Sequence, residues 1–147
     1  MPDVISQGSH LPLFADDSKC FRVIFNSVDQ GRLQEDLNAL YDWSLNRGME
    51  FNVEKCKILR IVRTRTTYDR QYHLGSSQLS VVQSEKDLGV WLSNTLNWNT
   101  HTDNMVAKAQ KMLGLLHRTS RDIDDHTVNR LLYSTWVRST LEYPSPI

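Results

Sequence analysis

The amino-acid sequence predicts an α+β fold, in which an antiparallel sheet with a packed crossover helix is followed by a helical region. Two short apolar runs, residues 11–15 and 21–25, flank a polar tip and are typical of the strands of a hairpin. A stretch with helical periodicity then leads to a second group of strand-like segments. From residue 97 onward the apolar residues recur at helical spacing only.

Asp16 and Asp17 lie at the centre of the predicted hairpin, between two apolar strands that we expect to be buried. An aspartate side chain hydrogen-bonds to nearby backbone, so one aspartate is sufficient to form a turn. Two adjacent carboxylates repel each other and favour a cation, and Mg²⁺ is commonly held by one or two carboxylates together with substrate phosphates. The residues themselves therefore leave a plain turn and a metal-binding tip both open.

The segment after the hairpin predicts a helix over about residues 28–47. Ser27 and Gln30 stand at capping-box spacing, and Gly48 marks the expected end. The residues expected on its buried face are Leu33, Leu37, Leu40, Tyr41 and Ser44. Residues 51–61 then predict a strand, which makes the helix a crossover between two strands.

The middle of the chain predicts a small antiparallel meander. Short strands are expected at residues 72–75 and 78–82, around a turn that begins at Gly75, and another strand is expected over residues 87–93. The polar and basic residues 63–71 predict a loop or the exposed end of a hairpin.

Two helices are expected after residue 97. Asn99 or Thr100 can cap the first helix, and Asp124 or Asp125 can begin the second, which Pro144 and Pro146 end. The residues expected to face inward in the first helix are Met105, Ala109, Met112, Leu113 and Leu116. Those expected to face inward in the second are Val128, Leu131, Leu132, Thr135 and Trp136.

These elements predict three parts: a poorly ordered N-terminus (residues 1–10), a sheet-and-helix part (residues 11–96) and a helical part (residues 97–147). The net charge is zero, but residues 1–54 hold four basic and nine acidic side chains, whereas residues 55–118 hold ten basic and four acidic ones. A basic segment beside an acidic tip suits a phosphate-bearing partner. Solvated faces that neutralise one another explain the same distribution.

The sequence predicts an intracellular chain, cytoplasmic or nuclear and not secreted. No apolar segment approaches the roughly 20 residues of a membrane span, and the first ten residues lack the basic and apolar regions of a secretory signal. Cys20 and Cys56 have no metal-ligand spacing and are expected to be buried free thiols. The five scattered histidines are expected at the surface or in packing roles.

Five stretches of the chain, in order, carry motifs of one protein family. They are Leu13-Phe14-Ala15-Asp16-Asp17-Ser18-Lys19, the helix of residues 33–44, Phe51-Asn52-Val53-Glu54-Lys55-Cys56-Lys57, Glu85-Lys86-Asp87-Leu88-Gly89-Val90, and a pattern that includes Tyr133, Val137-Arg138 and Leu141-Glu142-Tyr143. Through these motifs the chain resembles the reverse transcriptase of non-LTR (LINE-type) retrotransposons. The similarity runs over about residues 11–143 and implies the second half of the polymerase palm followed by the start of the thumb.

The resemblance implies RNA-directed DNA polymerisation, with an RNA template, a DNA primer and deoxynucleotides as partners. Asp16 and Asp17 match the catalytic aspartates that hold Mg²⁺ in this family. Lys55 matches a motif lysine with an inferred role near the leaving pyrophosphate, as a proton donor or charge stabiliser; an exposed lysine at a strand end is the alternative. The resemblance further places Phe14, Leu88, Gly89 and Val90 in the region of the primer.

The chain departs from the family upstream of the hairpin. A two-metal site needs a third carboxylate from another strand, and Asp3 is the sole acid among the fifteen residues before Asp16. We therefore expect a fragment with half of an active site that does not polymerise alone. We also expect an exposed apolar face on the hairpin and association with a complementary polymerase fragment. The alternatives are a non-catalytic nucleic-acid-binding or interaction remnant, with Trp91 or Trp98 as base-contacting aromatics, and a reading frame without a cellular role.

Overall fold

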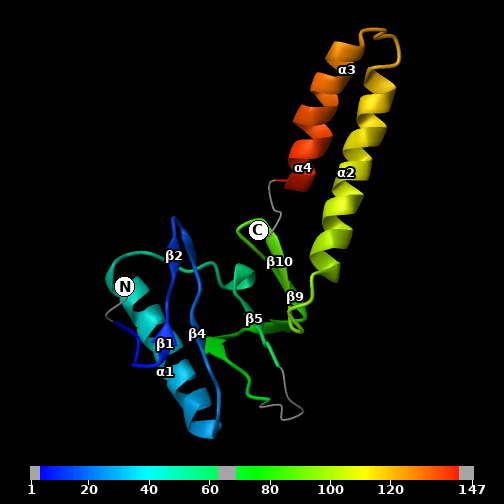
Figure 1. Cartoon of the computed structure of the whole chain (residues 1–147). Coiled ribbons are helices and arrows are strands. Elements are labelled where there is room, and N and C mark those ends of the chain that lie inside the picture. Colours follow the sequence, from blue (N-terminus) through cyan, green and yellow to red (C-terminus); the bar gives the residue numbers. More distant parts are fainter. Residues whose placement is uncertain (1–3, 63–68, 143–147) are drawn as a thin grey trace. The chain divides into compact units, whose positions relative to one another are not determined.

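The structure, a computed structural model, describes residues 4–62 and 69–142 and divides into two compact units, residues 1–82 and residues 83–147 (Figure 1). In the described residues, helices occur with five separate two-stranded sheets, four antiparallel and one parallel, which is compatible with an α+β fold. The predicted single antiparallel sheet with a crossover helix is wrong, because the strands on either side of the first long helix belong to different sheets. The division falls between residues 82 and 83, so the residues of the last two strands group with the helices that follow them. Among the described residues, no helix has the length and apolar character needed to cross a membrane.

The N-terminal hairpin of the first unit consists of β1 (Ser9–His10), β2 (Leu13–Phe14), β3 (Asp17–Ser18) and β4 (Phe21–Arg22). One register runs through it, from Ser9 opposite Arg22 to Phe14 opposite Asp17. Between these pairs the Lys19 N–H donates to the Pro12 carbonyl at 3.1 Å, and proline has no N–H to return a second bond. The hairpin therefore takes in residues 9 and 10, part of the segment that we expected to be poorly ordered.

Helix α1 (Ser27–Asn46) matches the predicted helix closely, although its cap differs. Asn26 is the N-cap residue, and its side chain accepts the Asp29 N–H at 3.0 Å, whereas the predicted capping box pairs Ser27, as the cap, with Gln30. The helix ends in a Schellman motif, because the N–H groups of Met49 and Gly48 donate to the Ser44 and Leu45 carbonyls. Gly48 has the positive φ of 66° that this motif requires.

The chain after α1 contains a 3₁₀ turn, η2 (Val53–Lys55), and the short strand β5 (Lys57–Leu59), where we expected one longer strand over residues 51–61. Strands β6 (His73–Leu74) and β7 (Ser77–Gln78) form an antiparallel hairpin, and β8 (Ser80–Val82) follows. β5 and β8 are parallel, so the predicted antiparallel meander is wrong at this pair. Most of the loop expected at residues 63–71 lies outside the described residues.

The β6–β7 hairpin is attached to α1 by a side-chain amide. Gln34 of α1 accepts the His73 N–H and donates to the His73 carbonyl, both at 2.9 Å, so the amide pairs with the strand as a neighbouring strand would. Gly75 forms the predicted turn at a φ of 60°, close to the ring of Tyr41. The buried apolar residues of this unit are Leu40, Tyr72, Leu74 and Leu79.

We predict that Gly75→Ala lowers the free energy of unfolding by roughly 2–4 kcal/mol. The added methyl group would lie 2.5 Å from Cζ of Tyr41, and the φ of 60° is unfavourable for alanine. Urea denaturation followed by helix circular dichroism measures the change. Gly48→Ala is the matched control, because Gly48 has a similar φ and no atom within 4 Å of the added group; it should cost only about 1 kcal/mol. Equal losses in the two variants would contradict the contact with Tyr41.

The second unit begins with the antiparallel strands β9 (Ser84–Asp87) and β10 (Val90–Ser93). Leu88 and Gly89 form the two-residue loop between them, with φ values of 47° and 94°, so the single strand predicted over residues 87–93 is wrong. His101, in the first turn of the following helix, is 2% exposed, and its Nδ1 accepts the Trp91 N–H at 3.2 Å. This bond joins β10 to the helix.

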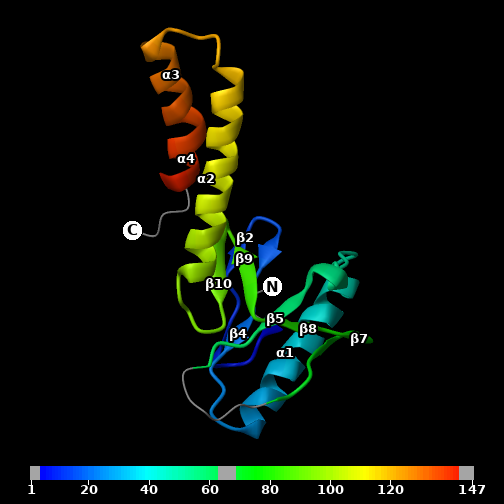
Figure 2. The same ribbon diagram turned by 90° about the vertical axis from the view of Figure 1, so that its right-hand side faces the viewer.

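That helix, α2 (Asn99–Thr119), packs against a second, continuous helical segment made of α3 (His126–Leu132), a π-helical stretch η3 (Tyr133–Arg138) and α4 (Ser139–Glu142) (Figure 2). Asp125 caps α3, as predicted, and accepts the Thr127 N–H at 2.7 Å. α2 begins at Asn99, so Asn99 and Thr100 are its first residues rather than its caps. The predicted helix end at Pro144 and Pro146 lies outside the described residues.

The predicted inward stripes are partly wrong in both helices. Ala109 and Leu116 are buried as expected, but Leu113 is exposed. In the second segment Leu131 is 66% exposed and Thr135 and Trp136 are also exposed, whereas Val137 is buried against α2. The wider turns of η3 account for part of this, because a π-helix holds more residues per turn than the period on which the prediction rests.

Leu88→Asn should raise the free energy of unfolding of the second unit by about 1 kcal/mol. Leucine at a φ of 47° is strained, whereas asparagine adopts positive φ readily and is favoured before glycine in two-residue hairpin loops. Thermal and urea unfolding measure the gain. Leu131→Asn, at an exposed leucine within a helix, should give no gain; a loss of stability in Leu88→Asn would contradict the strain at this loop.

Candidate metal-binding hairpin

The tip of the N-terminal hairpin (residues 14–17) carries the two aspartates. Ala15 and Asp16 form its two-residue loop, so the turn lies one residue before the predicted Asp16–Asp17 position, and Asp17 begins β3 opposite Phe14. Ala15 has a φ of 53°, which costs a non-glycine residue about 1–2 kcal/mol. Both carboxylates are exposed to solvent.

The strands around the tip are exposed rather than buried, which corrects the expectation of two buried strands. Phe14 is 64% exposed, and in the chain beyond β4 Phe25 is 76% exposed. Phe14, Asp17 and Phe21 share one face of the hairpin, because cross-strand partners and alternate residues lie on the same side of a sheet. Phe21 stacks on His10 there, with ring centroids 5.0 Å apart. The expected exposed apolar face is therefore confirmed.

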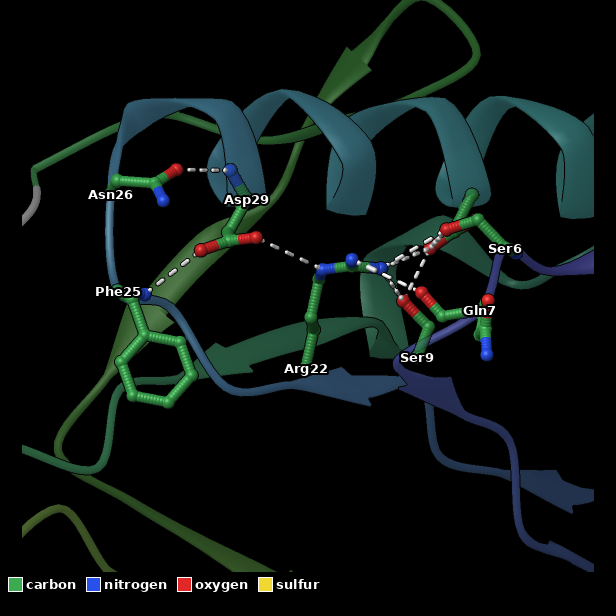
Figure 3. Close-up of polar contacts among 8 residues, drawn as sticks. Ser6, Gln7, Ser9, Arg22, Phe25, Asn26 and Asp29 are labelled. Carbon is green, nitrogen blue, oxygen red and sulfur yellow. Dashed lines mark hydrogen bonds and ion pairs between the residues drawn. The ribbon is translucent and has the colours of Figure 1, made fainter.

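The opposite face of the hairpin holds a buried ion cluster at the hairpin base, beside α1 (Figure 3). The Arg22 side chain is only 5% exposed, and its Nη1 lies 3.8 Å from Oδ2 of Asp36. The same Nη1 donates to Oγ of Ser9 at 2.9 Å and to Oγ of Ser6 at 3.0 Å. Nη2 donates to the Gln7 carbonyl at 3.2 Å. One guanidinium thus contacts the preceding loop, the paired strand and the helix.

Two carboxylates of α1 complete the cluster. Asp29 Oδ1 lies 3.8 Å from Nε of Arg22, and its Oδ2 accepts the Phe25 N–H at 3.1 Å. Asp36 is 3% exposed and accepts the Ser6 N–H at 2.7 Å, together with the hydroxyl groups of Ser6 and Ser9. A spacing of seven residues puts both carboxylates on one face of the helix, which is the sequence signal that could have indicated a buried cation opposite them.

Cys20 lies between β3 and β4, near this cluster, as a free and partly buried thiol. Burial raises the pKa of Cys20 from 9.0 to about 11; the Asp36 carboxylate adds to the rise, and the Arg22 guanidinium opposes it. Burial also raises the pKa of Cys56, the other free thiol, against the effect of Lys57. Both thiols are therefore poor nucleophiles at neutral pH.

Alkylation of Cys20 in the folded Cys56→Ser chain should increase with pH through a midpoint near 11, against an ordinary midpoint near 9.0 when the chain is unfolded in urea. The thiolate is the reactive form, so the iodoacetamide rate against pH reports its pKa. Because the folded thiol keeps its proton more strongly, Cys20 favours folding below pH 9, and this contribution is lost as the pH rises to 11. Equal folded and unfolded midpoints would contradict the burial of Cys20.

The remaining predicted site residues are Lys55 in the first unit and three residues in the second unit. Lys55 is exposed at the end of η2, and among the described residues no hydrogen bond or ion pair joins it to Asp16 or Asp17. Leu88 and Gly89 form the β9–β10 loop, and Val90 begins β10. These three residues belong to the second unit, whereas the hairpin tip and Lys55 belong to the first.

The tip fits part of a magnesium site. Carboxylate oxygens are the ligands that Mg²⁺ prefers, and the two side chains are accessible. Within residues 4–62 and 69–142, however, the structure places no group of three or more His, Cys, Asp or Glu side chains so that they could hold a metal ion. Asp16 and Asp17 can thus supply ligands, and further ones would have to come from a substrate, water or another segment.

Comparisons with known proteins identify no relative. No protein-family model, no curated protein and no solved structure matches the chain. A functional assignment therefore depends on the residues of the chain and their geometry.

Proposed function

We propose that the chain is part of a reverse transcriptase of the non-LTR retrotransposon type, with the second half of a polymerase palm and the start of a thumb. The observation that carries the proposal is the hairpin tip. Phe14, Ala15, Asp16 and Asp17 form a tight two-residue turn that leaves both carboxylates accessible, although one aspartate would satisfy the turn.

The order of the elements supports the same proposal. The motif segments of the sequence correspond to the N-terminal hairpin, to α1, to the η2–β5 segment, to the β9–β10 hairpin and to the helical segments α3, η3 and α4. The resemblance gives these segments the same order in a palm and thumb.

Each proposed site residue then has a chemical role. Bound Mg²⁺ would supply charge neutralisation at the phosphates of the incoming deoxynucleotide. Asp16 and Asp17 offer the oxygen ligands that hold it. Lys55 offers a cation or a proton to the leaving pyrophosphate, and Phe14, Leu88, Gly89 and Val90 provide packing surface near the primer. The RNA template and the DNA primer are the proposed partners.

The purified chain should bind a divalent cation at the tip without extending a primer. Asp16 and Asp17 give an ion partial coordination, whereas two-metal nucleotidyl transfer needs a carboxylate from a further strand. Mn²⁺ titration followed by NMR should broaden the amide signals of residues 14–18 first. Asp16→Asn combined with Asp17→Asn should abolish this, and Asp42→Asn, at an exposed acid of α1, should leave it unchanged.

Primer extension on an RNA template with Mg²⁺ tests the catalytic half of the proposal. We expect no extension by the chain alone, and extension that depends on Asp16 when a polypeptide with the upstream palm strands of such a polymerase is added. Extension by the chain alone that is lost in Asp16→Ala would contradict the expectation that the site is incomplete. Absence of both Mn²⁺ broadening and complemented extension would overturn the proposed function.

A further inference from the structure

We propose that Arg22 is a positioning residue for the hairpin tip: by fixing the strand register at the hairpin base (residues 9, 10, 21 and 22), it sets the face on which Asp17 stands. The inference rests on the proposed function only where it calls the tip a metal site. The control of register by Arg22 stands on the geometry of the cluster.

The strand pairs of the hairpin follow one register. The same offset relates the pairs Ser9–Arg22, His10–Phe21, Leu13–Ser18 and Phe14–Asp17, although the base and the tip form two separate two-stranded sheets. Side chains alternate between the two faces, so a slip of one residue moves every side chain of a strand to the opposite face. Whatever fixes the register at the base therefore also decides whether Asp17 shares the outer face with Phe14 of the opposite strand.

Arg22 joins both strands of the base to α1. Ser9 stands directly opposite Arg22 in the ladder, and its Oγ both accepts from Nη1 of Arg22 and donates to Asp36. After a slip of one residue Ser9 would no longer face Arg22, and its hydrogen bonds to Nη1 of Arg22 and to Asp36 would be lost (Figure 3). The observed register therefore satisfies Arg22, Ser9 and Asp36 together, and a buried charge that loses its partners is strongly unfavourable.

The guanidinium of Arg22 has partners in three directions. Nε faces Asp29, Nη1 faces Asp36 and the serine hydroxyl groups, and Nη2 faces the Gln7 carbonyl. Three nitrogens in one plane therefore have separate partners in the loop, the strand and the helix. A lysine carries one compact charge and cannot hold these directions together.

Other restraints on the strand register are weak at the tip. All four residues of β2 and β3 are exposed, so little apolar packing selects their register. Strands that have no buried face specify their register weakly. The base, where the ion cluster is buried, is thus the part of the hairpin that can impose the register on the tip.

The test separates positioning from mere charge compensation. Arg22→Met alone leaves two buried carboxylates unpaired, so the full chain is also prepared as the triple variant Arg22→Met, Asp29→Asn, Asp36→Asn, which removes all three charges. The readout of register is the NMR contact between the Hα atoms of Leu13 and Ser18, which face each other as a non-hydrogen-bonded pair. Unfolding temperature and the amide signals of α1 report folding.

We expect the triple variant to unfold within a few degrees of the wild type and to retain the α1 signals, yet to lose more than half of the Leu13–Ser18 contact intensity. Arg22→Lys should retain an intermediate intensity, and Arg32→Met, at an exposed arginine of α1, should retain all of it. An undiminished contact in the triple variant would overturn the proposal. Loss of the α1 signals in the triple variant would also overturn it, since Arg22 would then serve folding alone.

Mn²⁺ titration of the same samples keeps this inference separate from the proposed function. If the tip of the wild type does not broaden, the metal site fails while the register result stands. If the wild type broadens at residues 14–18 and the triple variant broadens equally at Asp17, the positioning role fails while the metal site stands.

Discussion

The first unit depends on a guanidinium that is shielded from water between two carboxylates of one helix. Removing these charges from solvent is costly, and the cost is offset because Arg22 and Asp36 fill their bonding directions with hydroxyl and backbone groups. The apolar core that could otherwise hold these elements together is small, since the buried apolar residues described in this unit are Leu40, Tyr72, Leu74 and Leu79. Directional bonds therefore connect the hairpin to α1, and Gln34 connects the β6–β7 hairpin to the same helix by a similar device.

Elements with local signals could be predicted from the sequence. The span of α1 follows from its apolar spacing and from Gly48, the turn at Gly75 from its glycine, and the start of α3 from Asp125. The parallel pairing of β5 with β8 could not be predicted, because it joins segments more than twenty residues apart. The strand predicted over residues 87–93 is wrong for a different reason. Leucine is rare at positive φ, so the sequence did not indicate a loop at Leu88 and Gly89.

The candidate site also has one part that the local sequence predicts and one part that it does not. The hairpin tip is four consecutive residues, so its conformation follows from local chemistry, although the position of the turn differs by one residue. The base is built from Ser6, Ser9, Arg22, Asp29 and Asp36, which are spread over thirty residues. An arginine within an apolar run and two acids on an amphipathic helix each look like solvent-exposed residues when taken separately. Only the fold brings their charges together.

The two-residue loop at Ala15 and Asp16 also constrains how this segment can evolve. Substitution of an exposed side chain such as Phe14 leaves the backbone pairs intact. Insertion or deletion of a single residue between Ser9 and Arg22 is different in kind, because it reverses the alternation of one strand unless a bulge absorbs it. A change of chain length between these two residues therefore disturbs the hairpin more than most changes of side chain along it.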